Sequence, residues 1–142
     1  MLAERVETTM SVLVVEDNPT IALIIRRLAV KAARTEVEVA HTASEALTLV
    51  HGNSYSLLVV DQIRPGGMSG LQFIKSVRMV NRYQSIPIVM VTGDQELSLK
   101  TGADQLGGFR LLRKPIDTTE FRWAVQTCLG IDGDPELHAY SA

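Results

Sequence analysis

The feature that most constrains the fold is a short apolar run, Leu57 to Val60, that leads directly into Asp61. An apolar run without polar alternation is typical of a strand buried on both faces, as in a parallel sheet that helices cover on both sides. An ionised aspartate is costly inside such a sheet. We therefore expect Asp61 at the carboxyl end of its strand, which is the edge where open α/β sheets bind ligands.

Other strand-like runs end in polar side chains in the same way. They are residues 11–16, which end in Glu16 and are followed by Asp17, residues 86–91, which are followed by Thr92, and residues 109–113, which are followed by Lys114. Residues 36–40 alternate between glutamate and valine, which predicts a half-buried strand at the edge of the sheet. Because parallel strands place their carboxyl ends on one edge, we expect these polar groups to meet there.

Helices are predicted between the strands and after the last one. Their expected limits are Asn18 to Ala32, Thr42 to Gly52, Ser69 to Val80, residues 94–106, and Asp117 to Gly130. Asn18 suits an N-cap and Pro19 the first helical position, and Thr42 with Glu45 has the capping-box pattern. Alternating strands and helices predict an α/β fold with right-handed crossovers. We expect one domain over residues 11–130, with flexible tails at 1–10 and 131–142.

Composition and charge exclude several classes of function. The net charge of −2, with no basic cluster longer than Arg26-Arg27, gives no basis for binding nucleic acid or an anionic membrane. Cys128 is the only cysteine, so no internal disulfide is expected, and the chain suits a reducing cytoplasm. No apolar run approaches the roughly 20 residues that span a bilayer.

The polar groups expected at the sheet edge are the parts of a phosphoryl-accepting site. Glu16, Asp17 and Asp61 would offer the hard oxygen ligands that Mg²⁺ prefers, and without a cation their charges would repel one another. An aspartate can attack phosphorus to form an aspartyl phosphate, provided that a divalent ion, a cation and a donor surround the phosphoryl oxygens. Lys114 and Thr92 would supply the cation and the donor.

Four motifs, in order and at matching spacing, resemble those of the receiver domains of two-component response regulators. The motifs are Val12 to Asn18, Leu58 to Asp61 with Pro65 and Gly70, Ile88 to Gly93, and Lys114-Pro115. The resemblance covers about residues 11–130. It implies a doubly wound, flavodoxin-like (βα)5 fold with strand order 2-1-3-4-5, and a cis peptide bond between Lys114 and Pro115.

The same resemblance implies a role for each residue of the site. Asp61 would be the phosphoacceptor, Thr92 would hydrogen-bond the phosphoryl group, and Lys114 would pair with it. The Mg²⁺ site would consist of Glu16, Asp17, Asp61 and the main-chain carbonyl of Ile63, with Asp17 binding directly and Glu16 largely through water. The phosphoryl donor would be a sensor histidine kinase or a His phosphotransfer protein.

We expect a stand-alone receiver, because nothing in this chain resembles an output domain. It would signal to a downstream effector protein by docking, by relay, or as a phosphate sink, and homodimerisation is left open. Such a domain catalyses only its own phosphorylation and dephosphorylation, so it is a signalling domain rather than an enzyme.

One departure from the family pattern keeps other functions open. Leu111 stands where the family usually carries an aromatic residue, three positions before Lys114. A receiver-like docking module that works without phosphorylation is therefore one alternative. The other is a small phosphatase with an aspartyl nucleophile, although neither a second acid–base group nor a lid is evident after Asp61.

The remaining distinctive side chains carry no motif of their own. Trp123 has two open interpretations, packing against a neighbouring helix or anchoring a partner. The histidines His41, His51 and His138 share no metal-ligand spacing and are expected at the surface.

Overall fold

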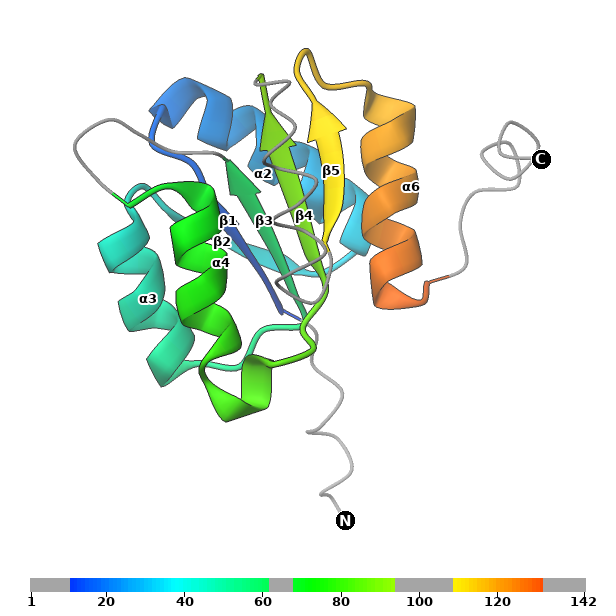
Figure 1. Cartoon of the computed structure of the whole chain (residues 1–142). Coiled ribbons are helices and arrows are strands. Elements are labelled where there is room, and N and C mark those ends of the chain that lie inside the picture. Colours follow the sequence, from blue (N-terminus) through cyan, green and yellow to red (C-terminus); the bar gives the residue numbers. More distant parts are fainter. Residues whose placement is uncertain (1–10, 62–67, 94–108, 132–142) are drawn as a thin grey trace.

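Five parallel strands form one sheet in the order β2-β1-β3-β4-β5, with helices on both faces (Figure 1). The computed structural model describes residues 11–61, 68–93 and 109–131. The elements are β1 (Ser11–Val15), α2 (Pro19–Ala33), β2 (Glu36–Ala40), α3 (Ala43–Gly52), β3 (Leu57–Asp61), α4 (Gly70–Arg78), the 3-10 turn η1 (Asn81–Tyr83), β4 (Ile88–Thr92), β5 (Arg110–Arg113) and α6 (Thr118–Leu129). This is the flavodoxin-like topology that the resemblance implied.

The strands in the middle of the sheet are the most apolar ones. β3 and β4 are buried at every residue, and β1 at every residue after Ser11. β2 forms one edge of the sheet, with Glu36 and Glu38 exposed and Val37 buried, which confirms the predicted edge strand. β3 and β4 each extend one residue beyond the predicted apolar run, so Asp61 and Thr92 are the last residues of their strands.

Alternate residues of the middle strands face two separate cores. One core lies under α3 and α4 and includes Leu13, Val15, Leu58, Val60 and Met90. The other lies under α2 and α6 and includes Val12, Val14, Leu57, Val59 and Val91. The two helix pairs accordingly cover opposite faces of the sheet (Figure 1). Burial on both faces explains the lack of polar alternation in these strands.

The helices begin at the capping residues expected from the sequence, with one difference. The side chains of Asn18, Ser69 and Asp117 accept hydrogen bonds from the first turns of α2, α4 and α6. Thr42 also caps α3, but the Glu45 carboxylate accepts from the main-chain N–H of His41, not from that of Thr42 as a capping box requires.

The helix ends show two departures from expectation. α4 ends at Arg78, two residues before the predicted Val80, and η1 follows it. Gly52 is the last residue of α3, but the chain leaves this helix through an extended Asn53 and not through a left-handed glycine. Gly130, by contrast, ends α6 in the left-handed conformation at φ 68°.

Some sequence predictions fall outside the described residues. They are the helix at 94–106, the tail at 1–10 and, apart from Ile131, the tail at 131–142. In the part of the chain that the structure describes, no helix combines the length and apolarity needed to cross a membrane.

Candidate functional site

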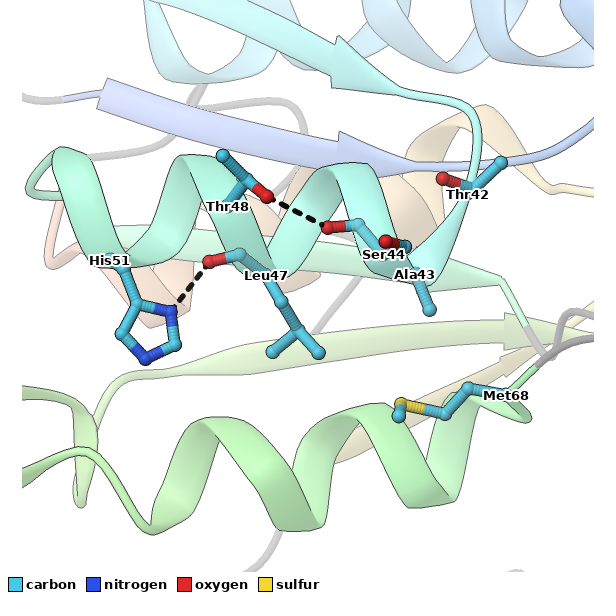
Figure 2. A pocket seen from close by; sticks show the side chains of 7 residues that line it. All are labelled: Thr42, Ala43, Ser44, Leu47, Thr48, His51 and Met68. Atoms are coloured by element: carbon cyan, nitrogen blue, oxygen red, sulfur yellow. Dashed lines mark hydrogen bonds between the residues drawn. The ribbon is translucent and has the colours of Figure 1, made fainter.

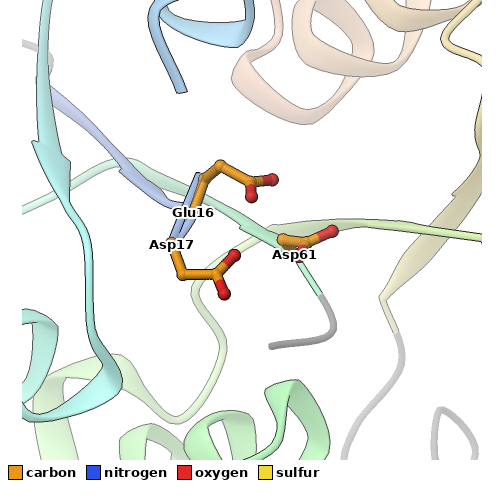
Figure 3. Close-up of side chains that lie close together, drawn as sticks. All are labelled: Glu16, Asp17 and Asp61. Atoms are coloured by element: carbon orange, nitrogen blue, oxygen red, sulfur yellow. The ribbon is translucent and has the colours of Figure 1, made fainter. Parts of the chain in front are cut away.

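Three carboxylates meet at the carboxyl edge of the sheet (Figure 3). Glu16 and Asp17 directly follow β1, and Asp61 ends the neighbouring strand β3, in a register that pairs Val15 with Val60. One oxygen from each carboxylate lies within 4.8 Å of the others. Among the described residues, this is the one group of histidine, cysteine or acidic side chains placed to share a metal ion.

Glu16 is the buried member of the group, with only 1% of its surface exposed. Its Oε2 accepts the main-chain N–H of Asn18 at 3.1 Å, whereas the buried Oε1 has no hydrogen-bond partner among the described residues. Burial raises the pKa of Glu16 from 4.5 to about 7; the charge of Asp61 adds to the rise, and the Asn18 N–H and the Lys114 ammonium oppose it.

Lys114 brings a cation to this site from the loop after β5. Its Nζ lies 2.7 Å from Oδ1 of Asp61 and 3.7 Å from Oε1 of Glu16. Burial acts to lower the pKa of Lys114, but the hydrogen bond that its ammonium donates to Asp61 and the nearby negative charges raise it above its usual value. The Lys114-Pro115 bond is cis, as the resemblance implied, and the Lys114 N–H donates to the Thr92 carbonyl at 2.9 Å.

Thr92 lies on the same edge of the sheet. It is buried, and it directly follows Val91, the residue of β4 that pairs with Asp61. The fold thus brings together five of the six predicted site residues: Glu16, Asp17, Asp61, Thr92 and Lys114. The sixth, Ile63, lies outside the described residues.

Leu111 packs inward from β5. It is partly buried and, together with Phe109, packs against the core under α3 and α4. The position where the resemblance would lead one to expect an aromatic ring is therefore filled by an aliphatic side chain in contact with the core.

Trp123 packs against the core under α2 and α6, and the Arg110 guanidinium lies 4.7 Å from its ring centroid. This arrangement supports the packing interpretation of Trp123.

A histidine that we expected at the surface adjoins the acidic group. The ring of His41 is exposed, but its Nδ1 lies 3.1 Å from the main-chain oxygen of Glu16. Because a carbonyl oxygen only accepts, Nδ1 carries the proton and donates it. The sequence held one signal for this position: His41 directly follows the strand at 36–40, whose carboxyl end lies on the same edge as Glu16.

An open groove lies between α3 and the start of α4. Figure 2 shows Met68 facing α3 across it. Its lining residues are Thr42, Ala43, Ser44, Leu47, Thr48, His51 and Met68. The lining contains no acid and no permanent cation, so the groove does not add to the chemistry of the acidic group.

The donor set of the site fits a hard divalent cation. Three carboxylates and one ammonium leave an excess of negative charge when all are ionised. The buried Oε1 of Glu16 accepts no hydrogen bond from the described residues and lies 3.7 Å from the Lys114 ammonium, so a cation would satisfy it as an acceptor. Mg²⁺ takes oxygen ligands and binds through a few carboxylates while keeping several waters. Glu16, Asp17 and Asp61 are therefore the residues that would hold it.

Comparisons with known proteins agree with this geometry. The family model of the response regulator receiver domain matches residues 12–126. The chemotaxis protein CheY of Pseudomonas aeruginosa is 30% identical over 107 residues, which cover 75% of this chain and 86% of that protein. The transcriptional regulatory protein YvrH of Bacillus subtilis is 30% identical over 115 residues, which cover 78% of this chain but only 45% of that protein.

A solved structure shows the same arrangement. The chemotaxis protein CheY4 of Vibrio cholerae superposes with a TM-score of 0.77 at 28% identity, over 85% of this chain and 99% of that one. The motif order, the sheet topology, the acidic group and the family match therefore agree, and the chain belongs to the response regulator receiver domains of two-component signalling.

Proposed function

We propose that this receiver accepts a phosphoryl group on Asp61 from a phosphohistidine of a sensor kinase or phosphotransfer protein, and that phosphorylation changes its contacts with an effector protein. The observation that carries the proposal is the setting of Asp61. Its carboxylate is held at the edge of the sheet, 2.7 Å from the Lys114 ammonium and beside the carboxylates of Glu16 and Asp17.

The reaction is an in-line displacement at phosphorus. An oxygen of Asp61 attacks the phosphorus atom and forms the O–P bond as the P–N bond to the donor imidazole breaks. The bonding electron pair stays on the imidazole nitrogen, which takes up a proton from water as it leaves. Asp61 is 8% exposed, so only a small part of its side chain is open to a phosphoryl donor.

Lys114 and Thr92 act on the phosphoryl oxygens. The Lys114 ammonium, now paired with Asp61, would turn to a phosphoryl oxygen once that carboxylate has become an ester. Thr92 ends the adjacent strand, where its hydroxyl would donate to another phosphoryl oxygen. Glu16, Asp17 and Asp61 would hold Mg²⁺, and its positive charge would neutralise the negative charge of the phosphoryl oxygens.

Exposed apolar side chains on α2 support docking of a protein donor. Leu23 and Ile24 are 47% and 52% exposed on α2, the helix that begins just after the acidic pair. Neighbouring exposed apolar side chains on one helix are typical of a surface that a partner covers. We assign this face of α2 to the phosphoryl donor.

The test uses beryllofluoride, which mimics an aspartyl phosphate. Mg²⁺ is titrated first, beryllofluoride is added next, and the amide NMR spectrum is recorded for the wild type and for Asp61→Asn. Glu36→Gln is the matched control, because it makes the same carboxylate-to-amide change at an exposed residue at the opposite end of a strand. Saturable, Mg²⁺-dependent shifts in the wild type and in Glu36→Gln, absent from Asp61→Asn, are the expected result.

The other outcomes separate the alternatives. Mg²⁺ binding without any response to beryllofluoride would contradict the proposal and favour a docking module that works unphosphorylated. Steady turnover of a phosphate monoester would instead favour a small phosphatase. Addition of one phosphoryl group from a small-molecule donor, detected by mass spectrometry and lost in Asp61→Asn, would confirm the acceptor residue.

A further inference from the structure

We propose that His41 is a positioning residue for the cation site, a role that rests on the function proposed above. Its imidazole holds the main chain at Glu16, so that the carboxylates of Glu16 and Asp17 keep the spacing with Asp61 that a divalent cation needs. His41 itself is not a ligand in this proposal; it acts through the peptide group that it contacts.

Both polar groups of the Glu16 main chain are tied to the end of β2. The Glu16 N–H donates to the Ala40 carbonyl at 3.0 Å. Ala40 is the register partner of Val15, the residue before Glu16. The Glu16 carbonyl accepts from Nδ1 of His41 at 3.1 Å. The backbone ladder between β1 and β2 is thus continued by a side chain at the point where the chain turns into α3.

His41 is in turn held by the first turn of α3. Its main-chain N–H donates to Oε1 of Glu45 at 2.9 Å, and the Glu45 N–H donates to Oγ1 of Thr42 at 3.0 Å. Ala43 and Ala46 anchor the same turn in the core. The ring therefore extends from a fixed backbone, and its contact with Glu16 joins a rigid helix start to the acidic group.

The carbonyl that His41 contacts belongs to the peptide unit that joins Glu16 to Asp17. Rotation of this unit would turn the two side chains relative to each other. Glu16 is buried and braced by the N–H of Asn18, whereas Asp17 is exposed. A restraint on the shared peptide unit therefore sets the position of the less restrained carboxylate. Partners of this kind, which hold ligands without binding the metal, commonly change metal affinity by about 10- to 100-fold.

The experiment compares Mg²⁺ affinity among three variants. His41→Leu removes the donor, and His41→Asn places an amide nitrogen close to the position of Nδ1. His51→Leu is the matched control, because its Nδ1 also contacts a carbonyl, that of Leu47 at 2.7 Å, in the groove of Figure 2 and not at the acidic group. The readout is the Mg²⁺-dependent shift of the Asn18 amide, which donates to Glu16; thermal unfolding without Mg²⁺ is measured in parallel.

We expect Mg²⁺ to bind His41→Leu about tenfold more weakly than the wild type, the low end of the range for such partners. His41→Asn and His51→Leu should bind like the wild type. Wild-type affinity in His41→Leu, an equal loss in His51→Leu, or failure of His41→Asn to restore binding would each overturn the inference. If His41→Leu does not fold, His41→Gln replaces it, because its amide lies one bond further out; equal affinity of His41→Gln and His41→Asn would then overturn the inference.

Failure of the proposed function would look different. A wild type that does not bind Mg²⁺ would overturn the proposed function, and this inference with it. A wild type that binds Mg²⁺ and responds to beryllofluoride, next to an unaffected His41→Leu, would overturn the inference alone.

Discussion

Replacing Glu16 by glutamine tests the electrostatics of the acidic site in the absence of Mg²⁺. Glutamine keeps the shape of the side chain and an acceptor oxygen for the Asn18 N–H, but it cannot ionise. Burial, together with the charge of Asp61, raises the pKa of Glu16 from 4.5 to about 7. Between these two values the unfolded wild type releases a proton that the folded protein retains. The free energy of unfolding of the wild type therefore falls as the pH rises.

The size of this effect follows from the shift in pKa. At about 1.4 kcal/mol per pH unit, a rise from 4.5 to about 7 corresponds to about 3 kcal/mol. The contribution of Glu16 to the free energy of unfolding is fully present below pH 4.5. It falls as the pH rises and is lost once the pH passes about 7. The variant Glu16→Gln lacks this titration. Its free energy of unfolding, relative to that of the wild type, should therefore rise by about 3 kcal/mol between pH 4.5 and pH 8.

The assay is urea unfolding at several pH values in the presence of a chelator. Titrating groups far from Glu16 are shared by the two proteins, so their effects cancel in the difference. Glu36→Gln, an exposed carboxylate-to-amide change, controls for the general loss of a negative charge. A difference between Glu16→Gln and wild type that stays constant from pH 4.5 to pH 8 would refute the reasoning. Saturating Mg²⁺ at pH 8 should stabilise the wild type more than the variant, because the cation binds only the folded carboxylates.

Three further results are expected. Mg²⁺ affinity measured by calorimetry should rise with pH and level off above about pH 7, because Glu16 must lose its proton to bind the cation; a flat profile would contradict this. Lys114→Met should bind Mg²⁺ more tightly and beryllofluoride more weakly, as followed by NMR, since the ammonium repels the cation but pairs with the mimic; parallel changes in both affinities would argue against that division. Arg82→Met should lower the free energy of unfolding, measured in urea, by about 1.5–3 kcal/mol, because the guanidinium donates to the three carbonyls of Val50, His51 and Asn53 at the end of α3. The control is Arg27→Met at an exposed position, whose free energy of unfolding should stay within about 0.5 kcal/mol of the wild type.

Much of the fold could be predicted because it is encoded locally. Unbroken apolar runs predicted the buried middle strands, and the alternation at 36–40 predicted the edge strand β2. Asn18, Ser69 and Asp117 predicted where helices begin, because an N-cap satisfies main-chain donors only two or three residues away. Predictions failed where the local signal was ambiguous, as at the end of α4, where apolar spacing continues to Val80 although the helix stops at Arg78.

The sequence by itself determined which polar groups reach the carboxyl edge of the sheet, because strand ends are visible as the points where apolar runs stop. Only the tertiary structure decided how those groups divide their roles. Glu16 and Asp17 are neighbours in the chain, yet one is buried and the other exposed. Lys114 pairs with Asp61 at 2.7 Å and lies farther from Glu16, and His41 contacts the carbonyl of a residue 25 positions away. These pairings depend on strand register and loop direction, which arise from packing across the whole sheet and leave no trace in local sequence spacing.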